Sequence, residues 1–267
     1  MSPGRIIAIM LRQYYLVRGS FSRVFPLFAW VAVDMVLWGF LTRYLNTVAP
    51  SGFNFVPALL GAVLFWDFFI RIMQGVTMAF FEDVWSRNFL NIFATPLRTS
   101  EYVSGLVLSS VASSMVGLAV TMFIATVFFR LSFFVYGLMA IPFLLVLFLF
   151  GIALGIFGSA LVLRFGPASE WFIWPIPALI SPFVGVLYPI STLPQWMQYV
   201  SYVLPPSYVF ESLRAIVSGA QVSGTWLLWS ACLSIAYIFI AYRFFIRIYT
   251  HCLRTGLIAR YSAESVS

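Results

Sequence analysis

Long stretches without a charged side chain constrain this chain more than any other feature of its sequence. Residues 102–129, 131–163 and 171–210 contain no Asp, Glu, Lys or Arg. Each stretch is longer than the about 20 apolar residues that a helix needs to cross about 30 Å of hydrocarbon. Charged residues make up only 9% of the 267 residues, whereas about a quarter of a soluble domain is charged. The sequence therefore predicts an all-α polytopic membrane protein.

The charged and metal-binding residues exclude several other kinds of protein. The net charge is +7, but in a membrane protein basic residues set orientation and meet anionic headgroups, so no nucleic-acid partner is expected. One histidine and two cysteines are too few for a metal cluster, so no metal is expected. No nucleophile and base pair supports a membrane-embedded enzyme.

We expect one membrane domain, residues 1–267, with six transmembrane helices. A basic, partly amphipathic segment at residues 1–23 precedes them and is expected to lie along the inner surface. The expected fourth span is longer than one crossing needs, so it is tilted, kinked at Pro142 or preceded by outer-surface residues. The expected spans are about 24–42, 56–81, 102–129, 133–163, 171–190 and 226–242.

The uncharged stretch before Glu211 is long enough for two crossings, so the span number needs an argument. Six spans place both termini and eleven of the fifteen arginines in the cytoplasm, as the positive-inside rule prefers. Seven spans would send the arginines of the tail outward. Four prolines between Pro189 and Pro206 also indicate that residues 191–223 form short re-entrant or interfacial helices before the last span.

Residues 82–101, here called the coupling segment, form a polar-faced stretch between two hydrophobic runs. Trp85, Phe89, Phe93 and Leu97 recur every fourth residue, which predicts an amphipathic helix on a membrane surface. Pro96 lacks an amide hydrogen and must end or restart that helix. We expect a second short helix there, with Thr95 as its cap.

Three ionisable residues are expected inside the membrane. Asp67 and Arg71 lie four apart on one face of the second span, and Asp34 lies halfway through the first. Charges at this depth are costly and should face the protein interior and pair. They form either a polar lining of a transport path, a latch between the first two spans, or a purely structural pair.

Two further patterns concern packing. Gly151, Gly155 and Ser159 form a ridge of small residues, which predicts close helix packing inside one subunit rather than a dimer seam. Glu211 and Arg214 lie three apart on a short helix. They either brace that helix or form a solvated pair.

Two sequence blocks resemble the exporter-type permeases of ATP-binding cassette transporters of the second bacterial class. They are WSRNFLNIFATPLRTSEY after the second span and LYPISTLPQWMQYVSYVLPPSYVFESLRAI at Leu187–Ile216. The resemblance implies that an ATPase docks on the coupling segment and that outer gate helices lie at about 193–203 and 207–217. The implied ATPase-coupling residues are Glu82, Trp85, Arg87, Phe89, Pro96, Leu97, Arg98 and Glu101. The implied outer-gate residues are Pro189, Leu193, Pro194, Trp196, Pro205, Pro206, Glu211 and Arg214.

The resemblance also implies a function. A dimer of permease subunits, expected to be identical, would work with two ATPase subunits in the inner membrane of a bacterium, among membrane lipids. It would export an amphipathic or lipid-linked substrate such as a glycan, a lipid or a drug. The sequence contains no G-x-x-x-x-G-K-[ST] phosphate loop, so this chain is not expected to be an enzyme, and ATP and Mg²⁺ belong on the partner.

One alternative from another class stays open. An ion- or proton-coupled secondary transporter would use Asp34, Asp67 and Arg71 and would need no ATPase. The sequence does not name the substrate, and it does not distinguish a continuous channel from a transient cleft.

Overall fold

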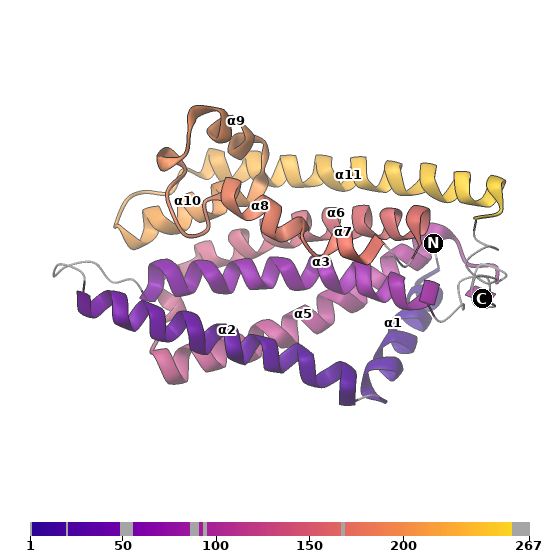
Figure 1. Cartoon of the computed structure of the whole chain (residues 1–267), viewed down its shortest axis with the longest axis horizontal. Helices are drawn as coiled ribbons and strands as arrows, with labels where there is room; N and C mark the ends of the chain where they lie inside the picture. The colour runs from indigo at the N-terminus through magenta and orange to yellow at the C-terminus, as the bar shows by residue number, and fades with distance from the viewer. Residues whose placement is uncertain are drawn as a thin grey trace.

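The computed structural model describes residues 2–19, 21–48, 56–85, 91–92, 95–166 and 169–257, and within these ranges it contains helices and no strand. The long helices lie roughly side by side along the longest axis of the molecule (Figure 1). The all-α class is therefore confirmed. The long helices are α2 (Phe21–Val48), α3 (Gly61–Trp85), α5 (Thr99–Phe129), α6 (Ala140–Phe165) and α11 (Gly224–Thr255).

The core is a row of helices with α6 and α3 at its centre. α6 packs on α11 on one side and on α3 on the other, while α3 also packs on α5. α5 in turn carries α2 and the N-terminal helix α1 (Pro3–Arg18). α3 is consequently covered on most sides, and its side chains make up much of the buried apolar core.

The ridge of small residues on α6 faces α3 of the same chain. A Cβ atom added to Gly155 would lie 2.7 Å from Val76 Cβ and 3.0 Å from the carbonyl oxygen of Met73. The Thr77 hydroxyl of α3 donates a hydrogen bond to the Gly155 carbonyl at 3.1 Å. The ridge is therefore confirmed as a packing surface inside one subunit.

Within the described residues, four helical stretches are long and apolar enough to cross a membrane: 56–84, 99–129, 137–165 and 224–255. The first of them includes the short π-helix η1 (Val56–Leu60) before α3. α2 is 28 residues long, which at 1.5 Å per residue also exceeds the thickness of the hydrocarbon. The number of six spans stays a prediction.

The expected fifth span at 171–190 differs most from the structure. Its helix is broken into α7 (Glu170–Ile173) and α8 (Ile176–Val184). Pro175 and Pro177 have no amide hydrogen to continue a helix. Gly185, with φ of +64°, then ends α8 in the left-handed conformation. The apolar part, 171–184, is shorter than a straight crossing of the bilayer requires.

Helix α6 starts later than the span that was expected there, and helix α11 ends later than its expected span. Two short 3₁₀ turns, η2 (Phe133–Val135) and η3 (Gly137–Met139), precede α6, and Pro142 lies in its first turn instead of making a kink. α11 runs on to Thr255, because Phe245, Ile248 and Cys252 recur on one buried face.

The two ends of the helical row have different contents. The start of α1, the end of α3, the start of α5 and the ends of α6 and α11 share one end, here called the coupling end (Figure 1). The opposite end carries α8, α9 (Gln195–Val203) and α10 (Pro205–Val217). A 3₁₀ turn, η5 (Ile190–Thr192), joins α8 to α9.

Candidate functional site

The two ends of the coupling segment belong to long helices, α3 and α5. We call these ends its upstream root and its downstream root. α3 continues through Glu82 to Trp85, so the first residues of the segment belong to its last turn. α5 begins at Thr99, so Glu101 lies in its first turn. Among the expected coupling residues, Arg87 and Phe89 lie outside the described residues.

The expected second short helix at Pro96 is wrong. Thr95 to Arg98 is not helical, and the Thr95 hydroxyl donates to the carbonyl of Ile92 instead of capping a helix. Helix α5 starts later because Glu101 accepts a hydrogen bond from the backbone amide of Arg98 at 3.1 Å. That contact satisfies one of the free amides at the helix start.

The upstream root of the coupling segment contains a fully buried carboxylate, Asp83. The Arg12 guanidinium of α1 donates to Asp83 Oδ1, and the Tyr102 hydroxyl of α5 donates to Asp83 Oδ2 at 2.6 Å. Burial on its own would lower the pKa of Arg12, but the hydrogen bond and charge of Asp83 raise it above the ordinary value. Asp83 therefore joins α1, α3 and α5.

The downstream root contains a second buried carboxylate, Glu101. Its Oε1 accepts from the backbone amide of Ser2 at 2.7 Å, and its Oε2 accepts from Arg5 Nη1 at 3.2 Å. Glu101 therefore fixes the start of α1 against the start of α5.

The two ion pairs Arg5–Glu101 and Arg12–Asp83 together form what we call the α1 clamp. Arg5 and Arg12 lie seven residues apart, which is about two helical turns, so they lie on one side of α1. Gln13 is also buried, and among the described residues its Nε2 has no hydrogen-bond partner. The clamp holds both roots of the coupling segment on a single helix.

Sequence reasoning missed the clamp. The resemblance implied that Glu101 contacts an ATPase, whereas the carboxylates of both Asp83 and Glu101 bind α1 or the residue before it. The available signal was weak: a basic amphipathic segment with arginines two turns apart, and two acidic residues beside the ends of hydrophobic runs. Only the fold brings partners together that are 71 and 96 residues apart in the chain.

The three charged residues that are expected inside the membrane lie midway along α2 and α3. Arg71 Nε and Nη2 both donate to Asp67 Oδ2, each at 2.9 Å. Asp34 of α2 lies within electrostatic reach of both residues. The structure thus pairs Asp67 with Arg71 on one face of α3, as their spacing predicts.

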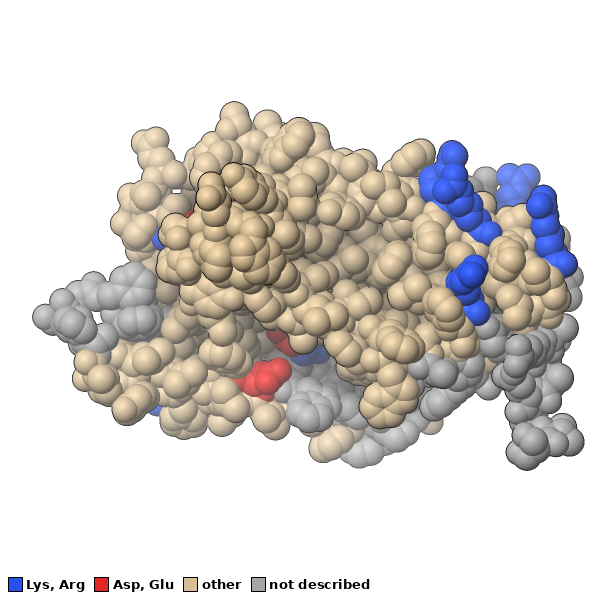
Figure 2. All heavy atoms as spheres, turned by 45° about the horizontal axis from the view of Figure 1, so that its top comes forward, with Lys and Arg blue, Asp and Glu red and all other residues tan. Residues whose placement is uncertain are grey.

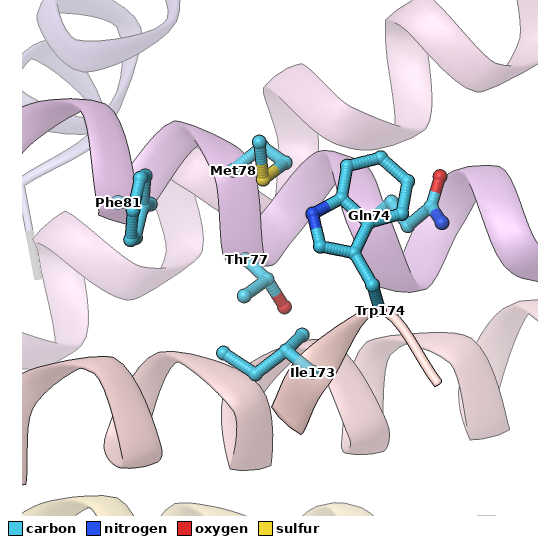
Figure 3. Close-up of a pocket in the computed structure, with 6 residues that line it drawn as sticks. All are labelled: Gln74, Thr77, Met78, Phe81, Ile173 and Trp174. Atoms are coloured by element: carbon cyan, nitrogen blue, oxygen red, sulfur yellow. The ribbon is translucent and has the colours of Figure 1, made fainter. Parts of the chain in front are cut away.

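A small hollow lies between α3 and the end of α7 (Figure 3). Gln74 and Met78 of α3 face Trp174, which follows α7. The Thr77 hydroxyl at this hollow is already engaged with backbone carbonyls of α3 and α6. The remaining lining residues are apolar, so the hollow offers little polar chemistry of its own.

Helices α8 to α10 form one connected unit at the opposite end. Glu211 Oε1 of α10 accepts from the Ile190 amide at 2.7 Å and from Arg214 Nη2 at 2.8 Å. Arg214 Nη1 donates to the Gly185 carbonyl at 2.6 Å. The pair braces the turn between α8 and η5, as one of its two interpretations expects.

The prolines of this unit start its helices. Pro189 precedes η5 and Pro194 precedes α9, both in extended conformation. Pro205 and Pro206 occupy the first two positions of α10, where the missing amide costs nothing. Leu193 accepts a hydrogen bond from Gln198 through its carbonyl, and Trp196 is mostly exposed.

We expect Glu211→Ala to loosen the turn around Gly185, whereas Glu211→Gln should largely preserve it because the amide oxygen still accepts from Ile190. A hydrogen bond to a charged group contributes about 1.5–3 kcal/mol. Thermal unfolding in detergent and limited proteolysis at residues 185–194 measure the effect. Equal behaviour of the two variants would contradict the bracing role of the carboxylate.

Comparison with known proteins adds the family. The model of the ABC-2 type transporter family matches residues 6–218, a range that contains both the coupling segment and the α8–α10 unit. No curated protein matches the sequence. Family membership implies association with an ATP-binding cassette ATPase. The chain therefore belongs to the ABC-2 type transporter family, as a multi-pass permease component.

Proposed function

We propose that this chain is the permease subunit of an exporter that moves an amphipathic or lipid-linked substrate out of the cytoplasm or inner leaflet. The substrate is a glycan, a lipid or a drug. A separate ATPase subunit, which carries ATP and Mg²⁺, drives the transport. The observation that supports this most is the α1 clamp, because a segment that is pushed by a partner must have firmly held roots.

The proposed orientation places the coupling end in the cytoplasm, with six spans and both termini inside. Basic side chains gather at that end, near the ends of α6 and α11 (Figure 2). The exposed arginines toward the ends of these two helices include Arg164, Arg243, Arg247 and Arg254. The positive-inside rule favours this orientation. In it, α2 is the first span, and the broken pair α7 and α8 is the fifth.

The proposed assembly has two permease subunits of identical sequence and two ATPase subunits in a bacterial inner membrane. ATP binding supplies the differential affinity that shifts the permease between two packings. The ATPase pushes the coupling segment, and the clamp makes α1, α3 and α5 respond together. The α8–α10 unit at the outer face would then open as the gate.

We expect the double variant Arg87→Glu, Arg98→Glu to lose most of the co-purifying ATPase, with recovery falling about tenfold or more because charge reversal opposes the docked partner. Arg98 is exposed, so its reversal leaves the core intact. Arg254→Glu is the matched control, since this exposed arginine lies at the same end but on α11. The measurement is co-purification in nanodiscs with the candidate ATPase.

Two results would contradict the proposal. The first is equal ATPase recovery by the double variant and by wild type. The second is that no ATPase binds the wild-type chain and substrate flux follows an ion or proton gradient. That second result would move the mechanism to Asp34, Asp67 and Arg71.

A further inference from the structure

Helix α11 has one exposed face that runs along its whole length, opposite the face that packs on α6. From Gly224 to Tyr242 the helix contains no charged residue. The large apolar side chains that are exposed in this part are Trp226, Leu228, Trp229, Ile235, Phe239 and Ile240. This part of α11 therefore presents an apolar surface to its surroundings.

The exposed face becomes basic at Arg243. Arg243, Arg247 and Arg254 are all exposed, and at about 100° per residue their positions on the helix fall within about 40° of one another. We call these three residues the arginine stripe. Phe245 and Cys252, from the same turns, are fully buried and lie on the opposite side of the helix. The stripe therefore continues the exposed apolar face and points away from the row of helices.

The length of α11 places the stripe relative to a membrane. The helix is long and apolar enough to cross a bilayer, and its part before Arg243 is about 28 Å long, which matches the about 30 Å of hydrocarbon. In that crossing, Arg243 and Arg247 lie about 6 Å apart along the helix, in the headgroup layer at the coupling end. Arg254 lies about 16 Å beyond Arg243 and is surrounded by water.

The two arginines in the headgroup layer have no acidic partner. In the described part of the chain, no carboxylate forms an ion pair with Arg243 or Arg247. Figure 2 shows basic side chains on the surface at the coupling end, whereas the acidic side chains in view lie nearer the middle of the molecule. The Arg243 guanidinium lies 5.6 Å from the centre of the Phe239 ring, one turn nearer the membrane centre. Two guanidinium groups, which bind phosphate in a bidentate manner, thus lie beside an apolar surface.

We propose that Arg243 and Arg247 bind the headgroup phosphate of an anionic phospholipid, whose acyl chain lies along the exposed apolar face at Phe239 and Ile240. A net negative headgroup offsets the two positive charges, which a zwitterionic headgroup does not. A soluble protein fits this position less well, because the hydrocarbon boundary keeps it from Arg243 and leaves it only Arg254. The proposal holds whether or not the permease exports the proposed substrate.

A fluorescent bimane label at Ile240→Cys reports lipid binding beside the two arginines. The full chain carries Cys232→Ser, since Cys232 is exposed, and keeps the buried Cys252. The labelled protein is placed in nanodiscs that contain phosphatidylglycerol or phosphatidylcholine with brominated acyl chains, and bromine quenches the label. We expect the site to prefer phosphatidylglycerol over phosphatidylcholine by about tenfold or more, because each arginine near an anionic surface adds to the binding.

We expect the double variant Arg243→Gln, Arg247→Gln to bind the two lipids about equally. The single variants Arg243→Gln and Arg247→Gln should each lose part of the preference. Arg254→Gln is the matched control, since it removes the same charge from the same face of α11 but beyond the headgroup layer. It should keep the full preference. Thermal unfolding in a zwitterionic detergent checks that all variants remain folded.

Equal quenching by the two lipids in the unmutated site would overturn the proposal, as would a preference that survives in the double variant. A loss in Arg254→Gln as large as in Arg243→Gln would show general attraction to the surface and no bound lipid. Displacement of the brominated lipid by millimolar glycerol phosphate would indicate a site for free phosphate instead. Loss of ATPase recovery in the double variant, with lipid preference unchanged, would assign the stripe to the ATPase and overturn lipid binding.

Discussion

Asp83→Ala is expected to cut ATP-driven transport by about tenfold or more and to lower the free energy of unfolding by about 3–5 kcal/mol. Asp83 is fully buried, and the variant leaves the Arg12 guanidinium and the Tyr102 hydroxyl without their shared acceptor. Removing one partner of a buried pair costs more than the pair itself contributes, because an uncompensated charge stays behind.

A double-mutant cycle separates the clamp from general damage. Arg12→Ala in the Asp83→Ala background removes the stranded charge, so we expect it to recover part of the lost stability. Arg18→Ala is the control, since Arg18 is an exposed arginine of the same helix. Unfolding in detergent and transport in proteoliposomes are both measured. An equal loss in Arg18→Ala, or additive losses at Arg12 and Asp83, would show that the ion pair has no special role.

Gly155→Val is expected to be the most damaging change in the α3–α6 seam. The added side chain would meet Val76 and the Met73 carbonyl at distances that contacts of real Cβ atoms hardly reach. Overpacking of this kind costs about 1–3 kcal/mol and more when backbone must move. We expect a lower midpoint of thermal unfolding and a smaller monodisperse fraction in detergent.

Gly224→Val is the matched control for this variant, because no atom lies within 4 Å of a Cβ placed at Gly224. Gly155→Ala should fall between the two. A Gly155→Val protein that unfolds at the wild-type temperature would mean that α3 and α6 can separate at no cost, contrary to the close seam between them.

The long apolar helices could be predicted because a helix that crosses a membrane needs a long stretch of apolar residues, which soluble proteins rarely contain. Stretches such as 102–129 can cross a bilayer only as helices, so α5 was predictable within three residues at its start. The small-residue ridge was predictable for a similar reason, since Gly155 has no side chain and lets a neighbouring helix pack closely against it. In both cases the residues that determine the feature are neighbours in the sequence.

The sequence did not reveal features whose cause lies elsewhere in the chain. Whether Asp83 faces water or Arg12 depends on where α1 folds back, which no local pattern around residue 83 records. The start of α5 at Thr99 likewise depends on a contact between Glu101 and the Arg98 amide that competes with the proline signal at Pro96. The break between α7 and α8 was signalled by Pro175 and Pro177, but the uncharged run concealed it.

The α1 clamp also determines how this protein can be recombined with its relatives. An exchange that brings in a foreign stretch from residue 83 to 101 without the matching α1 would separate both carboxylates from their arginines. An exchange confined to residues between Trp85 and Leu97 leaves both pairs intact. Natural or engineered permeases that acquire a new ATPase partner should therefore have their crossover points inside the clamp, or replace α1 together with the segment.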